Sequence, residues 1–177
     1  MSRGVLLHMK KSVVVFAFAL LFQGCTYAVS RDMAAQADKT ITFEMLLADP
    51  DTFKGKLLIL GGTLSHITNT KEGTLIEVVQ KPLDYWGKPK RTDRTGGRFL
   101  VRHAGYLDAM IFAPGRDITV AAEVVGTRSK ALGEMEYDYP VVVARELKLW
   151  ERESPSWDKP QWIDPLYDPY SAGRRDW

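Results

Sequence analysis

The chain has a single cysteine, Cys25, and no apolar run long enough to cross a membrane as a helix. One cysteine excludes an intrachain disulfide. The apolar run at residues 13–22 has ten residues, whereas a membrane-spanning helix needs about 20. Basic and acidic residues nearly balance, with a formal net charge of +2. The sequence therefore predicts no intrachain disulfide and no membrane-spanning helix, and it has no large excess of either charge.

Motifs for catalysis and phosphate binding are also missing. The glycine pairs lack the GxxxxGK[ST] spacing of a phosphate loop, no GxGxxG precedes a helix, and no GxSxG occurs. His66 and His103, with Asp84 or Asp108, match no zinc-ligand spacing. Aspartates in such loops usually make turns. We therefore expect no catalytic residue, metal or other cofactor, and an enzyme built on His103 and Asp108 is the weakest hypothesis left open.

The N-terminal segment has an ordered pattern. Three basic residues precede the apolar run, and Gly24 and Cys25 close it. The run has the length of a signal-peptide h-region. The pattern resembles a bacterial lipoprotein signal peptide with its lipobox, although Phe22 and Gln23 replace the commoner residues. The resemblance implies cleavage after residue 24 and acyl chains on Cys25, in thioether and amide linkage. A buried core helix or an uncleaved membrane anchor is the alternative.

Acylation of Cys25 has consequences for location and charge. Two or more acyl chains hold a protein firmly on a membrane. Thr26 stands where an aspartate would retain a lipoprotein in the inner membrane, so the lipoprotein sorting rule implies the outer membrane, facing the periplasm. Loss of residues 1–24 removes three basic groups and no acid, which lowers the formal net charge from +2 to −1. We therefore expect no nucleic-acid partner.

Composition divides the chain into four parts. Residues 1–24 are the signal peptide, and the polar, alanine-rich residues 25–40 are predicted to be a lipidated tether. Residues 41–153 form the folded domain. Residues 154–177 form a tail whose closely spaced prolines forbid a regular helix. This extended tail of prolines and aromatics either packs along the domain or contacts the membrane interface or a partner.

The folded domain is predicted to be mainly β. A short helix capped by Thr42 should end at Asp49-Pro50. Strands are predicted at residues 56–68, 74–80, 98–103, 117–125 and 140–150, with loops at 81–97 and 126–137. Gly61-Gly62 indicate a bulge or a sharp coil in the first strand. Five strands and an early helix favour a small OB-like barrel, with a β-sandwich as the alternative.

Basic and aromatic residues concentrate between the second and third predicted strands and just beyond. The basic residues are Lys88, Lys90, Arg91, Arg94, Arg98, Arg102 and Arg116. We predict a ligand surface at Lys88, Arg98 and Arg102 with Tyr85 and Trp86. A periplasmic location favours an anionic envelope glycan or a lipid headgroup as its ligand. The alternative is a solvated loop whose Lys and Arg stems cover apolar surface.

An ordered set of blocks carries a family resemblance. The blocks are residues 61–62, 74–78, 81–89, 97–100, 105–108, 114–120 and 139–142. Together with the N-terminal pattern and the aromatic tail, they resemble the Slp family of outer-membrane lipoproteins, known as starvation-inducible lipoproteins. The resemblance implies an envelope protein induced by starvation or acid stress and brings no catalytic activity. Ala121 stands where we expect glycine, a change that is tolerated unless φ is positive there.

Overall fold

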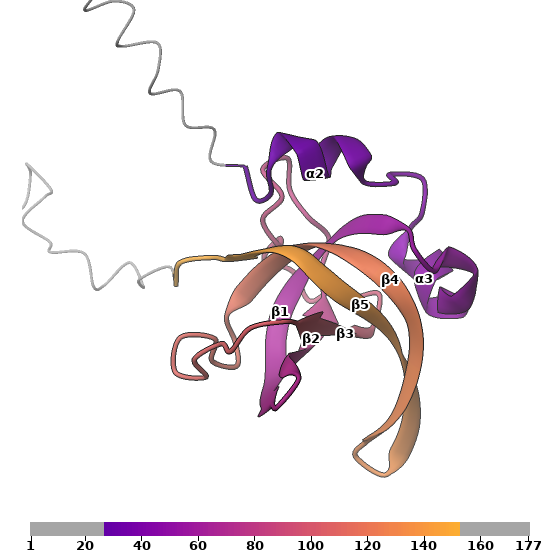
Figure 1. The fold of residues 1–177 in the computed structure, drawn as a ribbon, viewed down its shortest axis with the longest axis vertical. Helices are drawn as coiled ribbons and strands as arrows, with labels where there is room; N and C mark the ends of the chain where they lie inside the picture. The colour runs from indigo at the N-terminus through magenta and orange to yellow at the C-terminus, as the bar shows by residue number, and fades with distance from the viewer. Residues whose placement is uncertain (1–26, 153–177) are drawn as a thin grey trace, which may run out of the picture.

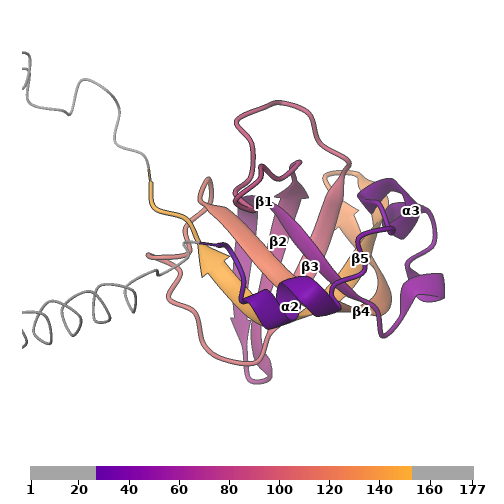
Figure 2. The same cartoon turned by 90° about the horizontal axis from the view of Figure 1, so that it is seen from above.

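The computed structural model describes residues 27–152, which form a five-stranded barrel with short helices (Figures 1 and 2). The strands close in the order β1-β2-β3-β5-β4, with β4 returning to β1. Every strand pair is antiparallel except β3 with β5. The elements are α2 (Arg31–Gln36), α3 (Phe43–Ala48), a 3-10 helix (Pro50–Phe53), β1 (Leu57–Thr70), β2 (Gly73–Gln80), β3 (Arg98–His103), β4 (Asp117–Leu132) and β5 (Met135–Leu149).

The prediction of a mainly β fold is confirmed, and the strands form a closed barrel in place of the alternative sandwich. The predicted helix is α3: the side chain of Thr42 accepts a hydrogen bond from the backbone N–H of Met45 at 3.3 Å, and the helix ends at Ala48 with Asp49 as its C-cap. Its Phe43 packs against Phe99 of the barrel core. No helix within residues 27–152 has the length and apolarity to cross a membrane.

The interior is filled by alternate residues of the strands. On β4, the side chains of Ile118, Val120, Ala122 and Val124 all belong to the core cluster and are fully buried. Thr119 and Ala121, on the opposite face of the same strand, are also fully buried, because other parts of the chain cover that face. No non-glycine residue among those described has positive φ, so Ala121 is unstrained.

The glycine pair lies where β1 bends from one partner strand to the next. Residues 57–63 of β1 pair with β4, and residues 62–70 pair with β2. A Cβ on Gly62 would lie 2.0 Å from the carbonyl oxygen of Val79, so only glycine allows this approach. The register irregularity falls between Leu64 and His66, beyond the glycines. The pair therefore makes the predicted coil, while the bulge lies farther along the strand.

The predicted loop at residues 126–137 is wrong. β4 continues to Leu132 and β5 begins at Met135, so the two strands form a long hairpin that extends away from the barrel (Figure 1). Most side chains from 127 to 136 are exposed. The alternation of apolar and polar residues that marks a half-buried strand is therefore absent here.

The prediction of a tether at residues 25–40 is wrong for most of the described part of that range, which packs on the barrel or forms α2. Ala28 and Val29 are buried against Ala121 of β4, with Met33 and Ala34 of α2 packed on the same cluster. The backbone N–H of Ser30 donates to a carboxylate oxygen of Glu146 at 2.7 Å. The folded domain therefore begins near residue 28 instead of residue 41. Cys25, the signal peptide and the predicted tail at 154–177 lie outside the described residues.

Candidate functional site

The tip of the β2–β3 loop is held in shape by Asp84. One oxygen of its carboxylate accepts hydrogen bonds from the backbone N–H groups of Trp86 and Lys88, each at 2.8 Å. This makes Asp84 a turn residue, as expected from the sequence. The turn leaves Tyr85 77 % exposed and Trp86 53 % exposed.

Tyr85 and Trp86 join Tyr27 in an exposed aromatic cluster. The three rings meet edge to face, with centroids 5.2–6.1 Å apart. The backbone N–H of Ala28 donates to the carbonyl of Trp86 at 3.2 Å, which fixes the loop beside the start of the folded domain. We call Tyr27, Tyr85 and Trp86 the aromatic cluster. Tyr27 was missed by sequence reasoning, because only the fold brings it to the loop.

A chain of hydrogen bonds attaches this loop to the barrel. The hydroxyl of Thr119 donates to the carbonyl of Gly87 at 2.6 Å and accepts from the indole N–H of Trp150 at 2.9 Å. Gly87 has a φ of +81°, and a Cβ there would lie 2.7 Å from the Cβ of Ala28. Glycine is therefore required where the loop crosses the N-terminal segment.

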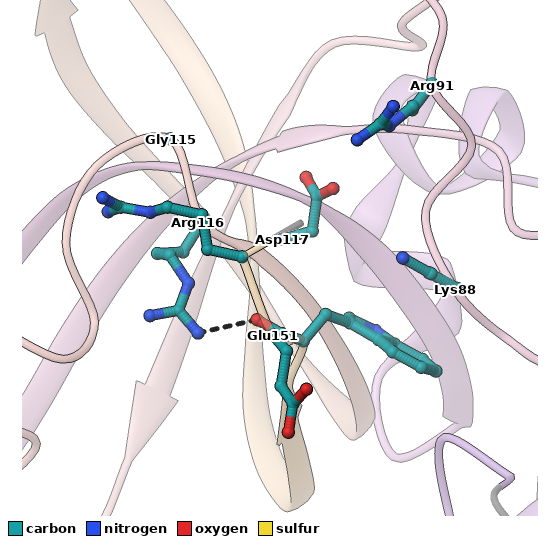
Figure 3. Close-up of a pocket in the computed structure, with 8 residues that line it drawn as sticks. Lys88, Arg91, Gly115, Arg116, Asp117 and Glu151 are labelled. Atoms are coloured by element: carbon teal, nitrogen blue, oxygen red, sulfur yellow. Dashed lines mark hydrogen bonds between the residues drawn. The ribbon is translucent and has the colours of Figure 1, made fainter. Parts of the chain in front are cut away.

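A basic pocket of about 170 Å³ opens beside the loop (Figure 3). Lys88 and Arg91 lie on one side of it, Arg116 lies on the other, and Asp117 lies between them. Its full lining is Lys88, Arg91, Gly115, Arg116, Asp117, Trp150, Glu151 and Arg152. Four of the lining side chains are cationic and two carry carboxylates.

Arg116 and Trp150 give the pocket a rigid wall. The guanidinium of Arg116 donates to the carbonyl oxygens of Trp150 at 2.7 Å and Ile111 at 3.1 Å. Its Nε is buried and has no hydrogen-bond partner within the described structure. The ammonium of Lys88 lies 5.8 Å from the centre of the Trp150 ring, within cation–π range. Arg152 and Trp150 were missed as site residues by sequence reasoning.

Arg98 belongs to a different arrangement on the outer face of the barrel. Its guanidinium donates to a carboxylate oxygen of Glu77 at 2.8 Å, and Lys130 of the hairpin donates to the other oxygen at 2.8 Å. Ser65 donates to the same carboxylate at 3.0 Å. Burial favours a raised pKa for Glu77, but hydrogen bonds from Lys130, Ser65 and Arg98 outweigh it and lower the pKa. We call these four residues the Glu77 network.

Arg102 is exposed and lines a third place, a hollow of about 260 Å³ beside Arg128. The five residues of the predicted ligand surface are therefore divided. Tyr85, Trp86 and Lys88 lie together in one loop, whereas Arg98 and Arg102 lie elsewhere on β3. The charge of Arg98 is already compensated within the fold.

The side chains of His103 and Asp108, the pair considered for catalysis, contact backbone atoms of their own loop. Nδ1 of His103 lies 3.1 Å from backbone atoms of Gly105, and Asp108 accepts from the backbone N–H of Met110 at 2.8 Å. No hydrogen bond within the described range joins His103 to Asp108. Between residues 27 and 152, no three His, Cys, Asp or Glu side chains gather to form a metal site.

Comparison with known proteins gives one family. Residues 22–177 match the outer membrane lipoprotein Slp family. The chain is 23 % identical to outer membrane protein Slp of Escherichia coli K12, covering 91 % of this chain and 93 % of that one. It is 28 % identical to an uncharacterized protein of Haemophilus influenzae, covering 80 % and 78 %. A single-stranded DNA complex of Schizosaccharomyces pombe Pot1pC matches with 9 % identity and a TM-score of 0.32, covering 58 % and 84 %, a likeness too low to carry an argument.

Proposed function

Since this chain belongs to the outer membrane lipoprotein Slp family, we propose that it is a lipoprotein held in the outer membrane by acyl chains on Cys25, with its barrel facing the periplasm. The observation that carries the proposal is the family match together with the lipobox pattern that ends at Cys25.

The proposed role is that of a non-enzymatic envelope component expressed under starvation stress. The turn roles of Asp84, His103 and Asp108 support this role, because each side chain is engaged with nearby backbone atoms. A hydrolytic activity of the purified protein that disappears in His103→Ala and Asp108→Ala would contradict it.

The anchor is tested by Cys25→Ser in cells fed labelled palmitate. We expect the wild type to incorporate the label and to appear in mass spectra without residues 1–24, and the variant to stay unlabelled and uncleaved. Thr26→Asp is the matched sorting variant: it should be acylated and yet move to the inner-membrane fraction. Normal cleavage and labelling of Cys25→Ser would refute acylation, and unchanged location of Thr26→Asp would refute the sorting argument.

The basic pocket supports a second candidate function, the binding of a phosphate-bearing envelope glycan or lipid headgroup. The four cationic side chains that line the pocket are of the type that binds phosphate groups through charge-assisted hydrogen bonds. The test is titration of the acylated protein in detergent with lipopolysaccharide, with anionic phospholipid and with inorganic phosphate. Arg91→Gln should weaken binding several-fold, while Arg102→Gln in the separate hollow should not. Equal binding by both variants would remove this candidate.

A further inference from the structure

Very few residues separate the proposed anchor, Cys25, from the folded domain. Tyr27 follows Cys25 by two residues, and an extended chain spans at most about 3.6 Å per residue. Their Cα atoms are therefore at most about 7 Å apart. Ala28 and Val29, the next two residues, are already buried in the folded domain. A barrel anchored in this way has no flexible spacer on which to stand off from the membrane.

This short distance places Tyr27 in the headgroup layer, provided that Cys25 is acylated as proposed above. The acyl chains lie in hydrocarbon, so Cys25 itself lies at the boundary with the headgroups. The headgroup and interfacial region is roughly 5–8 Å thick on each side of the hydrocarbon core. The Cα atom of Tyr27 is within about 7 Å of that boundary. This distance is similar to the thickness of the headgroup layer, so Tyr27 lies in that layer or at its outer edge.

The other two members of the aromatic cluster must share this position. The ring of Tyr27 lies 6.1 Å from that of Tyr85 and 6.0 Å from that of Trp86, measured between centroids. Tyr and Trp prefer the membrane–water interface, where the ring is sheltered and the polar end stays wet. Exposed rings of this type suit such an interface.

We propose that the barrel docks directly on the bilayer through Tyr27, Tyr85 and Trp86. The occupant of this surface is the lipid bilayer that holds the acyl chains. Lys88 follows the cluster in sequence by two residues and lines the basic pocket, so the pocket begins next to the loop that carries the rings. Figure 2 shows the two ends of the described chain at one side of the barrel, and Figure 1 shows the tip of the β4–β5 hairpin far from α2. The hairpin tip therefore points away from the lipid.

The test measures the depth of two matched positions in the acylated, full-length mature protein. Tyr85 is 77 % exposed in the aromatic cluster, and Met135 is 75 % exposed in the hairpin. Each is changed separately to cysteine and labelled with a nitroxide, because the acyl chain blocks the sulfur of Cys25. The protein is reconstituted in vesicles of phosphatidylethanolamine and phosphatidylglycerol. The collision rate of each label with a water-soluble nickel chelate is then measured, and the two positions are compared.

We expect the label at position 85 to be several-fold less accessible to the chelate than the label at position 135. Replacement of Trp86 by serine in the Tyr85→Cys protein should restore part of that accessibility, whereas Met135→Ser should not. The protection should persist in phosphatidylcholine vesicles, because it depends on the rings and not on headgroup charge. Equal accessibility at the two positions, or protection that vanishes in phosphatidylcholine, would overturn aromatic docking.

Mass spectrometry of the purified protein shows whether it is acylated. This measurement distinguishes failure of the docking proposal from failure of the anchor proposal on which it rests. Acylated protein that floats with vesicles but shows equal accessibility refutes docking and leaves the anchor intact. Protein that carries no acyl chain refutes the anchor, and docking falls with it. Thermal unfolding of Trp86→Ser should match the wild type, because that side chain is more than half exposed; a large loss of stability with unchanged protection of position 85 would also count against docking.

Discussion

Two groups of cationic side chains on this barrel differ in their surroundings: one group pairs with a buried carboxylate, and the other lines an open pocket. In the Glu77 network, Arg98 and Lys130 each donate to one oxygen of a single carboxylate that is only 7 % exposed. In the basic pocket, Lys88, Arg91, Arg116 and Arg152 surround two carboxylates around an open space. The first group surrounds a buried carboxylate, whereas the second lines an open pocket. Residue type alone does not distinguish them; the burial of their surroundings does.

The two groups differ because different strands and loops contribute their residues. The Glu77 network closes because the β4–β5 hairpin brings Lys130 to β2, 53 positions from Glu77 in the chain. The basic pocket stays open because its residues come from the β2–β3 loop, the start of β4 and the chain after β5, which meet around a gap (Figure 3). The comparison predicts that substitutions in the network change stability, and that substitutions in the pocket change binding.

The largest effect is expected for Glu77→Ala. Removal of this carboxylate leaves Arg98 and Lys130 without their shared partner, and loss of one member of a buried ion pair costs several kcal/mol. Because both cations are partly exposed, we expect a smaller loss of about 2 kcal/mol in the free energy of unfolding, measured with urea. Glu123→Ala, which breaks the exposed pair with Arg145, should cost about 0.5 kcal/mol. Equal costs would remove the distinction between buried and exposed pairs.

The same network should contribute to acid sensitivity. The folded-state pKa of Glu77 is lowered from its ordinary value of 4.5, so the folded state favours the ionised form. Its stabilisation is therefore present above pH 4.5 and is lost as the pH falls through the lower folded-state pKa. The stability gap between wild type and Glu77→Gln should shrink over that acidic range, as urea unfolding at a series of pH values will show. A gap that widens on acidification would mean that the pKa is raised.

Regular patterns made much of the fold predictable. The cap at Thr42, the alternation on β4 from Ile118 to Val124 and the six residues of β3 all follow local rules, and the structure confirms them. The hairpin beyond Gly126 was missed because both of its faces are largely exposed, so it carries no apolar alternation. The N-terminal segment was missed because Ala28 and Val29 are only two apolar residues, and they are buried through packing with Ala121, which is distant in the chain.

The candidate site was predictable only in part. Tyr85, Trp86 and Lys88 are neighbours in sequence, and the turn made by Asp84 keeps them together. Tyr27 and Arg152 come from opposite ends of the described chain, so no spacing rule connects them to that loop. The sequence alone did not show that Arg98 is paired, because its partner Glu77 lies 21 positions away in the chain. Prediction from sequence therefore succeeded for local contacts and failed for those made by closure of the barrel.

A smaller effect separates two neighbouring tyrosines beside the Glu77 network. The hydroxyl of Tyr137 accepts a hydrogen bond from the backbone N–H of Arg98 at 3.1 Å, whereas the buried hydroxyl of Tyr139 has no partner within the described structure. Tyr137→Phe should cost about 1 kcal/mol, because a backbone donor loses its acceptor. Tyr139→Phe should be neutral or slightly stabilising, because it removes an unpaired polar group. Urea unfolding of both variants will test the pair, and a larger loss for Tyr139→Phe would show that its hydroxyl has a partner.

The smallest stability effect is expected in the basic pocket, where Lys88 and Lys148 offer a matched pair. Each ammonium lies 5.8 Å from the centre of the Trp150 ring, but only Lys88 lines the pocket. Because a cation–π contact at an exposed site is worth about 0.5 kcal/mol, Lys88→Met and Lys148→Met should destabilise the barrel by similar small amounts. Only Lys88→Met should weaken phosphate binding, as measured by titration calorimetry. If Lys148→Met weakens binding equally, binding depends on the positive charge near Trp150 in general. The pocket is then not a site distinct from the surrounding surface.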